Sequence, residues 1–105
     1  MRIIWSRHAY NSLSDVLDYS EESFGLERAE KMKEKILCSI DRLGVFPVCS
    51  PVIAEISSET AVYRKLVVTR EISVIYRVQN DDVLIDFIWD IRRSLHHLYY
   101  LIHQS

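Results

Sequence analysis

Three arginines in the second half of the chain could bind phosphate or carboxylate groups. Arg92 and Arg93 are adjacent and follow a strongly apolar run, and Arg77 lies in the run before it. A guanidinium group binds either anion through paired hydrogen bonds, so these residues fit a phosphate site or a docking site for an acidic segment. The simpler interpretation is a solvated strand end, with Arg92 paired to Asp90 or Asp86.

Histidine and tyrosine residues gather near the C-terminus, but their spacing does not predict a metal site. The residues concerned are His96, His97, Tyr99, Tyr100 and His103. A metal site needs nearer ligands and usually a carboxylate, and no carboxylate follows Asp90. Because Gly25 and Gly44 are the only glycines, neither a phosphate-binding loop nor a dinucleotide-binding pattern is present. We therefore expect no metal and no cofactor.

The composition is typical of one globular, cytoplasmic domain spanning residues 1–105. The chain is 49% hydrophobic and 27% charged, which is enough apolar material for one modest core. Its net charge of −2 argues against general nucleic-acid binding, although residues 1–61 carry −3 and residues 62–105 carry +1. No apolar run is long enough for a membrane span or a signal sequence. Cys38 and Cys49 lack metal-ligand spacing and are interpreted as free thiols of a reducing compartment.

Two neighbouring runs in the second half alternate between apolar and polar residues, which predicts paired β-strands. These runs are residues 72–79 and 82–91, and the β-rich run 62–69 precedes them. One face of the two paired strands should be buried and carries Ile72, Val74, Tyr76, Val78, Val83, Ile85, Phe87, Trp89 and Ile91.

The opposite face of these strands is mixed, and we expect a partner to cover it. It carries Ser73, Ile75, Arg77, Gln79, Leu84, Asp86, Ile88, Asp90 and Arg92. A purely solvated face would not need Ile75, Leu84 and Ile88, and exposed apolar groups of this size cluster where partners bind. An acidic, amphipathic segment would suit this face, with its carboxylates on Arg77 and Arg92.

The first half of the chain predicts a short strand and two helices. Residues 2–5 are β-prone and must pair with the sheet. Ser6 can cap the first helix with its hydroxyl group, and Gly25 can end it because glycine accepts a left-handed backbone. A second apolar stripe predicts a helix from about Glu27 to Leu43. His8 lies in the first helical turn and is interpreted as a neutral surface residue.

The remaining segments are a connection and a tail. Residues 45–61 contain two prolines and several Ser and Thr residues, so at most a brief edge pairing near Val52–Ile56 is expected. Residues 94–105 form either a short helix or a loose tail. The order β-α-α-β-β-β predicts an α+β fold in which a helical hairpin packs on one face of an antiparallel sheet. The core of this domain spans about residues 3–93.

An ordered set of residues across positions 3–93 carries a family resemblance. The set is Trp5, Ser6, Ala9, Leu13, Tyr19, Ala29, Ile36, Ile40, Leu43, Pro47, Tyr63, Arg64, Leu66, Val68, Val74, Ile75, Tyr76, Val83, Ile85, Ile88, Asp90, Arg92 and Arg93. It resembles the RelE/ParE toxins of bacterial type II toxin–antitoxin systems, specifically the ParE-like branch. No single motif in the set is specific. The resemblance implies a toxin whose open sheet face and groove are wrapped by an antitoxin.

The resemblance leaves two targets open. ParE-like members act on DNA gyrase, whereas RelE-like members cleave mRNA in the ribosomal A site. RelE-like members carry a catalytic arginine on the strand that corresponds to residues 72–79; the aligned residue here is Ser73, although Arg77 is nearby. Arg93 and Tyr99 could match a basic residue and a tyrosine of the RelE-like site. The displaced arginine and the net charge of −2 favour a ParE-like protein without hydrolytic activity.

The implied partners are a cognate antitoxin and DNA gyrase, and the chain could form a homodimer or a toxin–antitoxin hetero-oligomer. The alternatives are a ribosome-dependent mRNA endonuclease, with Arg77, Arg93 and Tyr99 as catalytic groups, and a non-toxic homologue that keeps only antitoxin binding. The residues assigned to antitoxin or target binding are Arg64, Ile75, Arg77, Leu84, Ile88 and Arg92. Arg64 also has a structural interpretation, as an ion pair from the sheet to a helix carboxylate.

Overall fold

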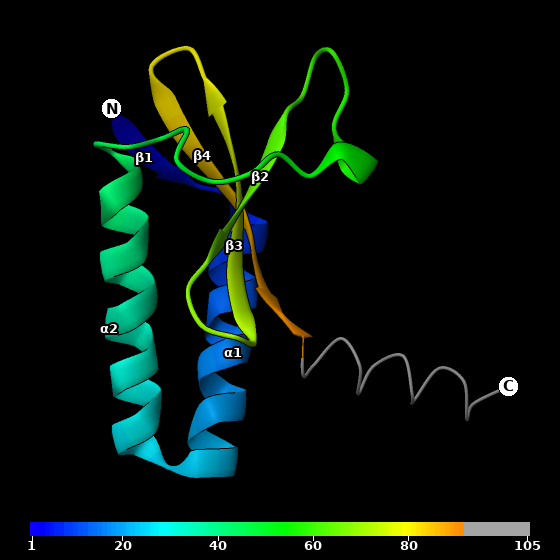
Figure 1. The fold of residues 1–105 in the computed structure, drawn as a ribbon. Coiled ribbons are helices and arrows are strands. Elements are labelled where there is room, and N and C mark those ends of the chain that lie inside the picture. The colour runs from blue at the N-terminus through cyan, green and yellow to red at the C-terminus, as the bar shows by residue number, and fades with distance from the viewer. Residues whose placement is uncertain (92–105) are drawn as a thin grey trace, which may run out of the picture.

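Two helices form one layer of the molecule, and a four-stranded sheet forms the other (Figure 1). The computed structural model describes residues 1–91. The elements are β1 (Arg2–Trp5), α1 (Arg7–Phe24), α2 (Leu26–Leu43), the short 3₁₀ helix η1 (Ala54–Ile56), β2 (Tyr63–Val67), β3 (Ile72–Gln79) and β4 (Asp82–Asp90). The expected tail at residues 94–105, whether helical or loose, lies outside the described residues.

The helix ends follow the local signals in the sequence. The Ser6 hydroxyl accepts a hydrogen bond from the Ala9 N–H at 2.9 Å, which satisfies one of the free donors of the first turn of α1. Gly25 ends α1 with a φ of 92°, a backbone conformation that only glycine adopts without strain. The predicted N-cap and the predicted stop of the first helix are therefore confirmed.

The sheet has the order β1-β4-β3-β2. β2 pairs with β3 and β3 pairs with β4 in the antiparallel direction, as the alternating runs predict. β1, in contrast, lies parallel to β4, with Ile3 opposite Val83. The α+β fold is therefore confirmed, but the sheet is mixed rather than wholly antiparallel. The β3–β4 turn is tight, and Asn80 has a φ of 57°, which asparagine tolerates better than most residues.

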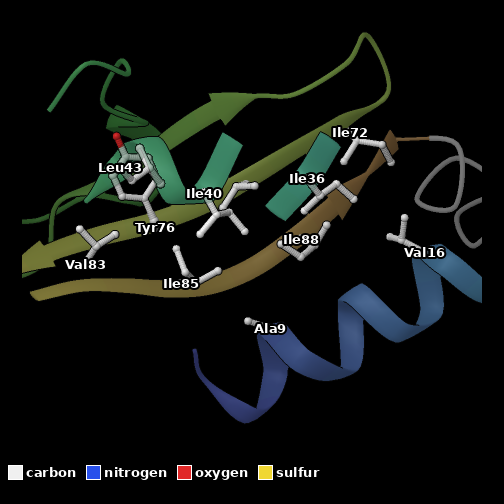
Figure 2. Packing of buried hydrophobic residues seen from close by; sticks show 11 residues of the cluster. Ala9, Val16, Ile36, Ile40, Leu43, Ile72, Tyr76, Val83, Ile85 and Ile88 are labelled. Carbon is white, nitrogen blue, oxygen red and sulfur yellow. The ribbon is translucent and has the colours of Figure 1, made fainter. Parts of the chain in front are cut away.

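The core lies between the helical hairpin and one face of the sheet (Figure 2). Its buried members are Ala9, Val16, Ile36, Ile40, Leu43, Ile72, Val74, Tyr76, Val83, Ile85 and Ile88. The two helical stripes thus cover the face that carries Ile72, Val74 and Tyr76, as expected. No helix within residues 1–91 has both the length and the apolar character needed to cross a membrane.

The connection after α2 covers the outer edge of β2. The Ile53 N–H donates to the Tyr63 carbonyl at 2.8 Å, and the Lys65 N–H donates to the Pro51 carbonyl at 3.1 Å. Val52 forms a single bridge to Arg64, which is the brief edge pairing expected from the sequence. These bonds satisfy backbone groups that would otherwise be open to another strand.

Candidate partner-binding face

A β-bulge at Asp86 decides which side chains of β4 face the helices. Ile75 lies opposite Phe87 and Tyr76 lies opposite Ile85, so Asp86 is an extra residue without a partner position on β3. Before the bulge, Val83 and Ile85 face the core; after it, the alternation is shifted by one residue. A one-residue shift moves every later side chain to the other face.

Two serines of the first helix region hold this bulge. The Ser6 N–H donates to the Ile85 carbonyl at 3.0 Å, and the Ser6 hydroxyl donates to the Asp86 carbonyl at 3.1 Å. The Ile88 N–H donates to the Ser12 hydroxyl at 2.9 Å, and that hydroxyl donates to the Ala9 carbonyl. β1 ends at Trp5, so α1 takes its place along the edge of β4 beyond Ile85.

The sequence places Ile88 on the partner-binding face, and this placement is wrong. Ile88 is only 1% exposed and points toward α1 in the core (Figure 2). Phe87 and Trp89, which strict alternation places in the core, lie on the other side, and Trp89 is 40% exposed. The cause is the extra residue at Asp86, which strict alternation ignores.

We call the side of the sheet that faces away from α1 and α2 the open face. The cross-strand register places Ile75, Arg77 and Leu84 there, as expected. The apolar residues of the open face are Ile4, Val67, Ile75, Leu84, Phe87 and Trp89. Sequence reasoning missed Ile4, Val67, Phe87 and Trp89. For Phe87 and Trp89, the sequence offered two signals of the bulge: Asp86 in the middle of the β4 run and Ser12 on the apolar stripe of α1.

The arginines of the open face are paired within the chain. Arg77 binds both carboxylate oxygens of Asp86, from Nε at 2.8 Å and from Nη2 at 2.9 Å, and its guanidinium lies 5.3 Å from the centre of the Tyr63 ring. The hydrogen bond to Asp86 raises the pKa of Arg77 above its ordinary value. Asp86 is thus the partner of Arg77.

Ser73, at the position that aligns with the RelE-like catalytic arginine, is closed off by its neighbours. It lies between Val67 and Trp89 on the open face and is only 5% exposed. A short hydroxyl at this depth carries no charge and has little access to a ligand. The position therefore provides no cation for a phosphate.

Aromatic rings follow the seam between the start of α1 and β4. His8 stacks on Phe87, with ring centres 4.7 Å apart and an angle of 25° between the ring planes. Phe87 in turn contacts Trp89, with ring centres 5.8 Å apart. Such contacts stabilise one arrangement of the rings and so limit their side-chain freedom. His8 is exposed, as predicted.

Arg64 lies on the other face of the sheet, opposite Tyr76. Its guanidinium donates to the Ser50 carbonyl at 2.7 Å, and the Tyr76 hydroxyl donates to the Pro47 carbonyl at 2.8 Å. Burial raises the pKa of Tyr76, so the phenol stays protonated and keeps donating. Arg64 therefore has a structural role as a loop anchor, although its partner is a backbone carbonyl rather than the helix carboxylate suggested by the sequence.

The other sequence-predicted groups belong to the C-terminal part of the chain. Arg92, Arg93 and Tyr99 lie outside residues 1–91, and so do the three C-terminal histidines. Within the described range, no group of three or more His, Cys, Asp or Glu side chains could hold a metal ion.

The fold and the face define a class of protein: a small α+β domain with a helical hairpin behind a four-stranded sheet and an apolar face left open. The family model described as ParE toxin of the type II toxin–antitoxin system, parDE, matches residues 3–96. The chain therefore belongs to this toxin family, and the resemblance found in the sequence is confirmed.

A solved structure supports the same fold. It is described as "Chromosomal ParDE TA system from P. aeruginosa" and superposes with a TM-score of 0.73 at 24% sequence identity. The match covers 87% of this chain and 96% of that chain. No curated protein matches the sequence.

Proposed function

We propose that this member of the ParE toxin family acts in the cytoplasm by binding DNA gyrase, without hydrolysing RNA, and that a cognate antitoxin neutralises it. The family membership supports the toxin role. The choice of gyrase over the ribosome depends on the chemistry of the open face.

The observation that carries this choice is the pairing of the open-face arginines. RNA cleavage requires cationic groups that can approach the scissile phosphate and stabilise the charge that develops there. Arg77 is held by two hydrogen bonds to Asp86, and Arg2 at the far end of the face is bound to Asp82 at 3.0 and 3.1 Å. Of the cations that the described strands place on this face, only Lys65 remains outside such a pair.

The antitoxin is proposed to cover the open face. Ile75, Leu84 and Trp89 lie on the open face of β3 and β4, and the helices lie on the other side of the sheet. Apolar side chains gathered on one exposed face are typical of partner surfaces. Arg92, which lies outside the described residues, is still proposed as an antitoxin contact. Ile88 and Arg64 are no longer proposed as contacts, because both face the core side of the sheet.

The test compares two activities of one purified preparation. We expect it to inhibit ATP-dependent supercoiling of relaxed plasmid by gyrase and to leave mRNA on programmed ribosomes uncut. Cleavage of that mRNA, lost in Arg93→Ala, would establish the endonuclease alternative instead. Binding of an antitoxin without either activity would identify a non-toxic homologue.

The control is Ile88→Asp, purified in the same way. A carboxylate at a position that is 1% exposed should prevent folding, so this variant must not inhibit gyrase. Inhibition that persists in Ile88→Asp would come from a contaminant.

A further inference from the structure

The arginines of the open face are paired with carboxylates of the same chain, which limits the kind of partner that fits this face. Arg77 and Asp86 have side chains 30% and 20% exposed and bind each other through two hydrogen bonds. A partner carboxylate that took Arg77 would only replace Asp86 and would leave that carboxylate unpaired. An acidic segment therefore gains little from Arg77, contrary to the sequence-based expectation.

The apolar part of the open face, in contrast, combines ordered aromatic rings with exposed apolar side chains. Phe87 is held between His8 and Trp89 by ring contacts of 4.7 and 5.8 Å. Trp89 is 40% exposed, and Val67, on the other side of buried Ser73, is 62% exposed. Rings that are already ordered lose little freedom on binding, and tryptophan is enriched among the residues that dominate interfaces.

We propose that the open face binds an apolar segment of the antitoxin, which packs a large aliphatic or aromatic side chain against Trp89 and Val67. This inference rests on the proposed function. Affinity comes from burial of apolar surface and not from ion pairs. It follows that binding depends weakly on salt and on the Arg77–Asp86 pair.

The test uses the protein encoded by the reading frame next to this gene as the probe, with titration calorimetry of the full chain. Val67→Ser and Trp89→Ser should each weaken binding about tenfold or more. The matched control is Val45→Ser, at another exposed valine (71%, compared with 62% for Val67) on the loop after α2, which should bind like wild type. Circular dichroism of each variant confirms that it is folded.

A second set of measurements separates apolar from ionic binding. The double variant Arg77→Gln/Asp86→Asn should bind within about twofold of wild type, and raising salt from about 50 to about 500 mM should weaken binding less than about threefold. A tenfold loss of affinity at high salt, or in the double variant, would contradict binding through an apolar segment. It would favour an acidic antitoxin segment instead.

Two other outcomes, a lack of binding to the probe and dimerisation of the free protein, would also contradict the inference. If the wild type does not bind the probe at any salt concentration, the proposed antitoxin pairing itself fails. If the free protein dimerises in sedimentation experiments and Val67→Ser makes it monomeric, the face binds a second copy of the chain, and the inference is wrong while gyrase inhibition can still hold.

Discussion

The Ser12 hydroxyl should contribute measurably to the free energy of unfolding, because it accepts a hydrogen bond from the buried Ile88 N–H just after the bulge. In Ser12→Ala the N–H loses its acceptor in a position that water cannot reach easily, since Ser12 is only 8% exposed. An unsatisfied buried donor costs about 1–3 kcal/mol. Alanine recovers roughly 0.5 kcal/mol through its higher helix propensity. The expected net loss is therefore about 0.5–2.5 kcal/mol of unfolding free energy.

Ser20 provides the matched control for this substitution. It lies on the same helix, is 3% exposed, and its hydroxyl has no hydrogen-bond partner within the described part of the chain. Ser20→Ala removes a buried polar group that makes no such bond, so it should be neutral or stabilise the protein by up to about 1 kcal/mol. The two substitutions are chemically identical. They differ in the hydrogen bonds that are lost, because only the Ser12 hydroxyl accepts from the Ile88 N–H and donates to the Ala9 carbonyl.

The assay is urea denaturation followed by circular dichroism, with the slope checked to be the same in all three proteins. Hydrogen exchange at the Ile88 amide should speed up in Ser12→Ala and stay slow in Ser20→Ala. Equal stability changes in the two variants would refute the claim that Ser12 holds the bulge.

Three further changes test other parts of the structure. Ile88→Ala should lose about 2–5 kcal/mol by leaving a cavity, whereas Ile4→Ala, at a position 40% exposed, should lose much less in the same urea titration. Gly25→Ala should cost about 1–3 kcal/mol, because the φ of 92° and ψ of 166° at this residue suit glycine alone, and the melting temperature should fall accordingly. Tyr76→Phe should cost about 1 kcal/mol at neutral pH through loss of the bond to the Pro47 carbonyl. Burial raises the pKa of Tyr76 in the folded state, so its contribution is complete below about pH 10 and is lost as pH rises through the folded pKa. The stability gap to Tyr76→Phe, measured by urea titration at increasing pH, should therefore narrow above about pH 10; a constant gap would contradict this.

Features that depend on neighbouring residues were predictable from the sequence. Ser6 caps α1 through Ala9, three residues later, and Gly25 ends the same helix through its own backbone freedom. The pairing of β3 with β4 likewise joins strands separated by a two-residue turn. In each case the deciding contact lies within a short stretch of chain.

Features that depend on distant residues were not predictable from periodicity. The bulge at Asp86 is held by Ser6 and Ser12, and the bond from Ile88 to Ser12 spans 76 residues. Alternation alone contains no information about such a contact, so it assigned Phe87 and Ile88 to the wrong faces. The partner of Arg64 was missed for the same reason, since a loop carbonyl leaves no side-chain signal in the sequence.

The pairing of β1 with β4 also determines when this toxin can fold during synthesis. Arg2 and Asp82 bind each other across 80 residues, and the Ser6 hydroxyl meets the Asp86 carbonyl across the same separation. The helical hairpin leaves the ribosome before β3 and β4, which supply the buried residues of the sheet that its apolar stripe packs against. Contacts of such long sequence separation form late and slowly. A nascent chain that ends before β4 therefore has neither a complete core nor a complete open face, and truncated translation products should be harmless to the cell.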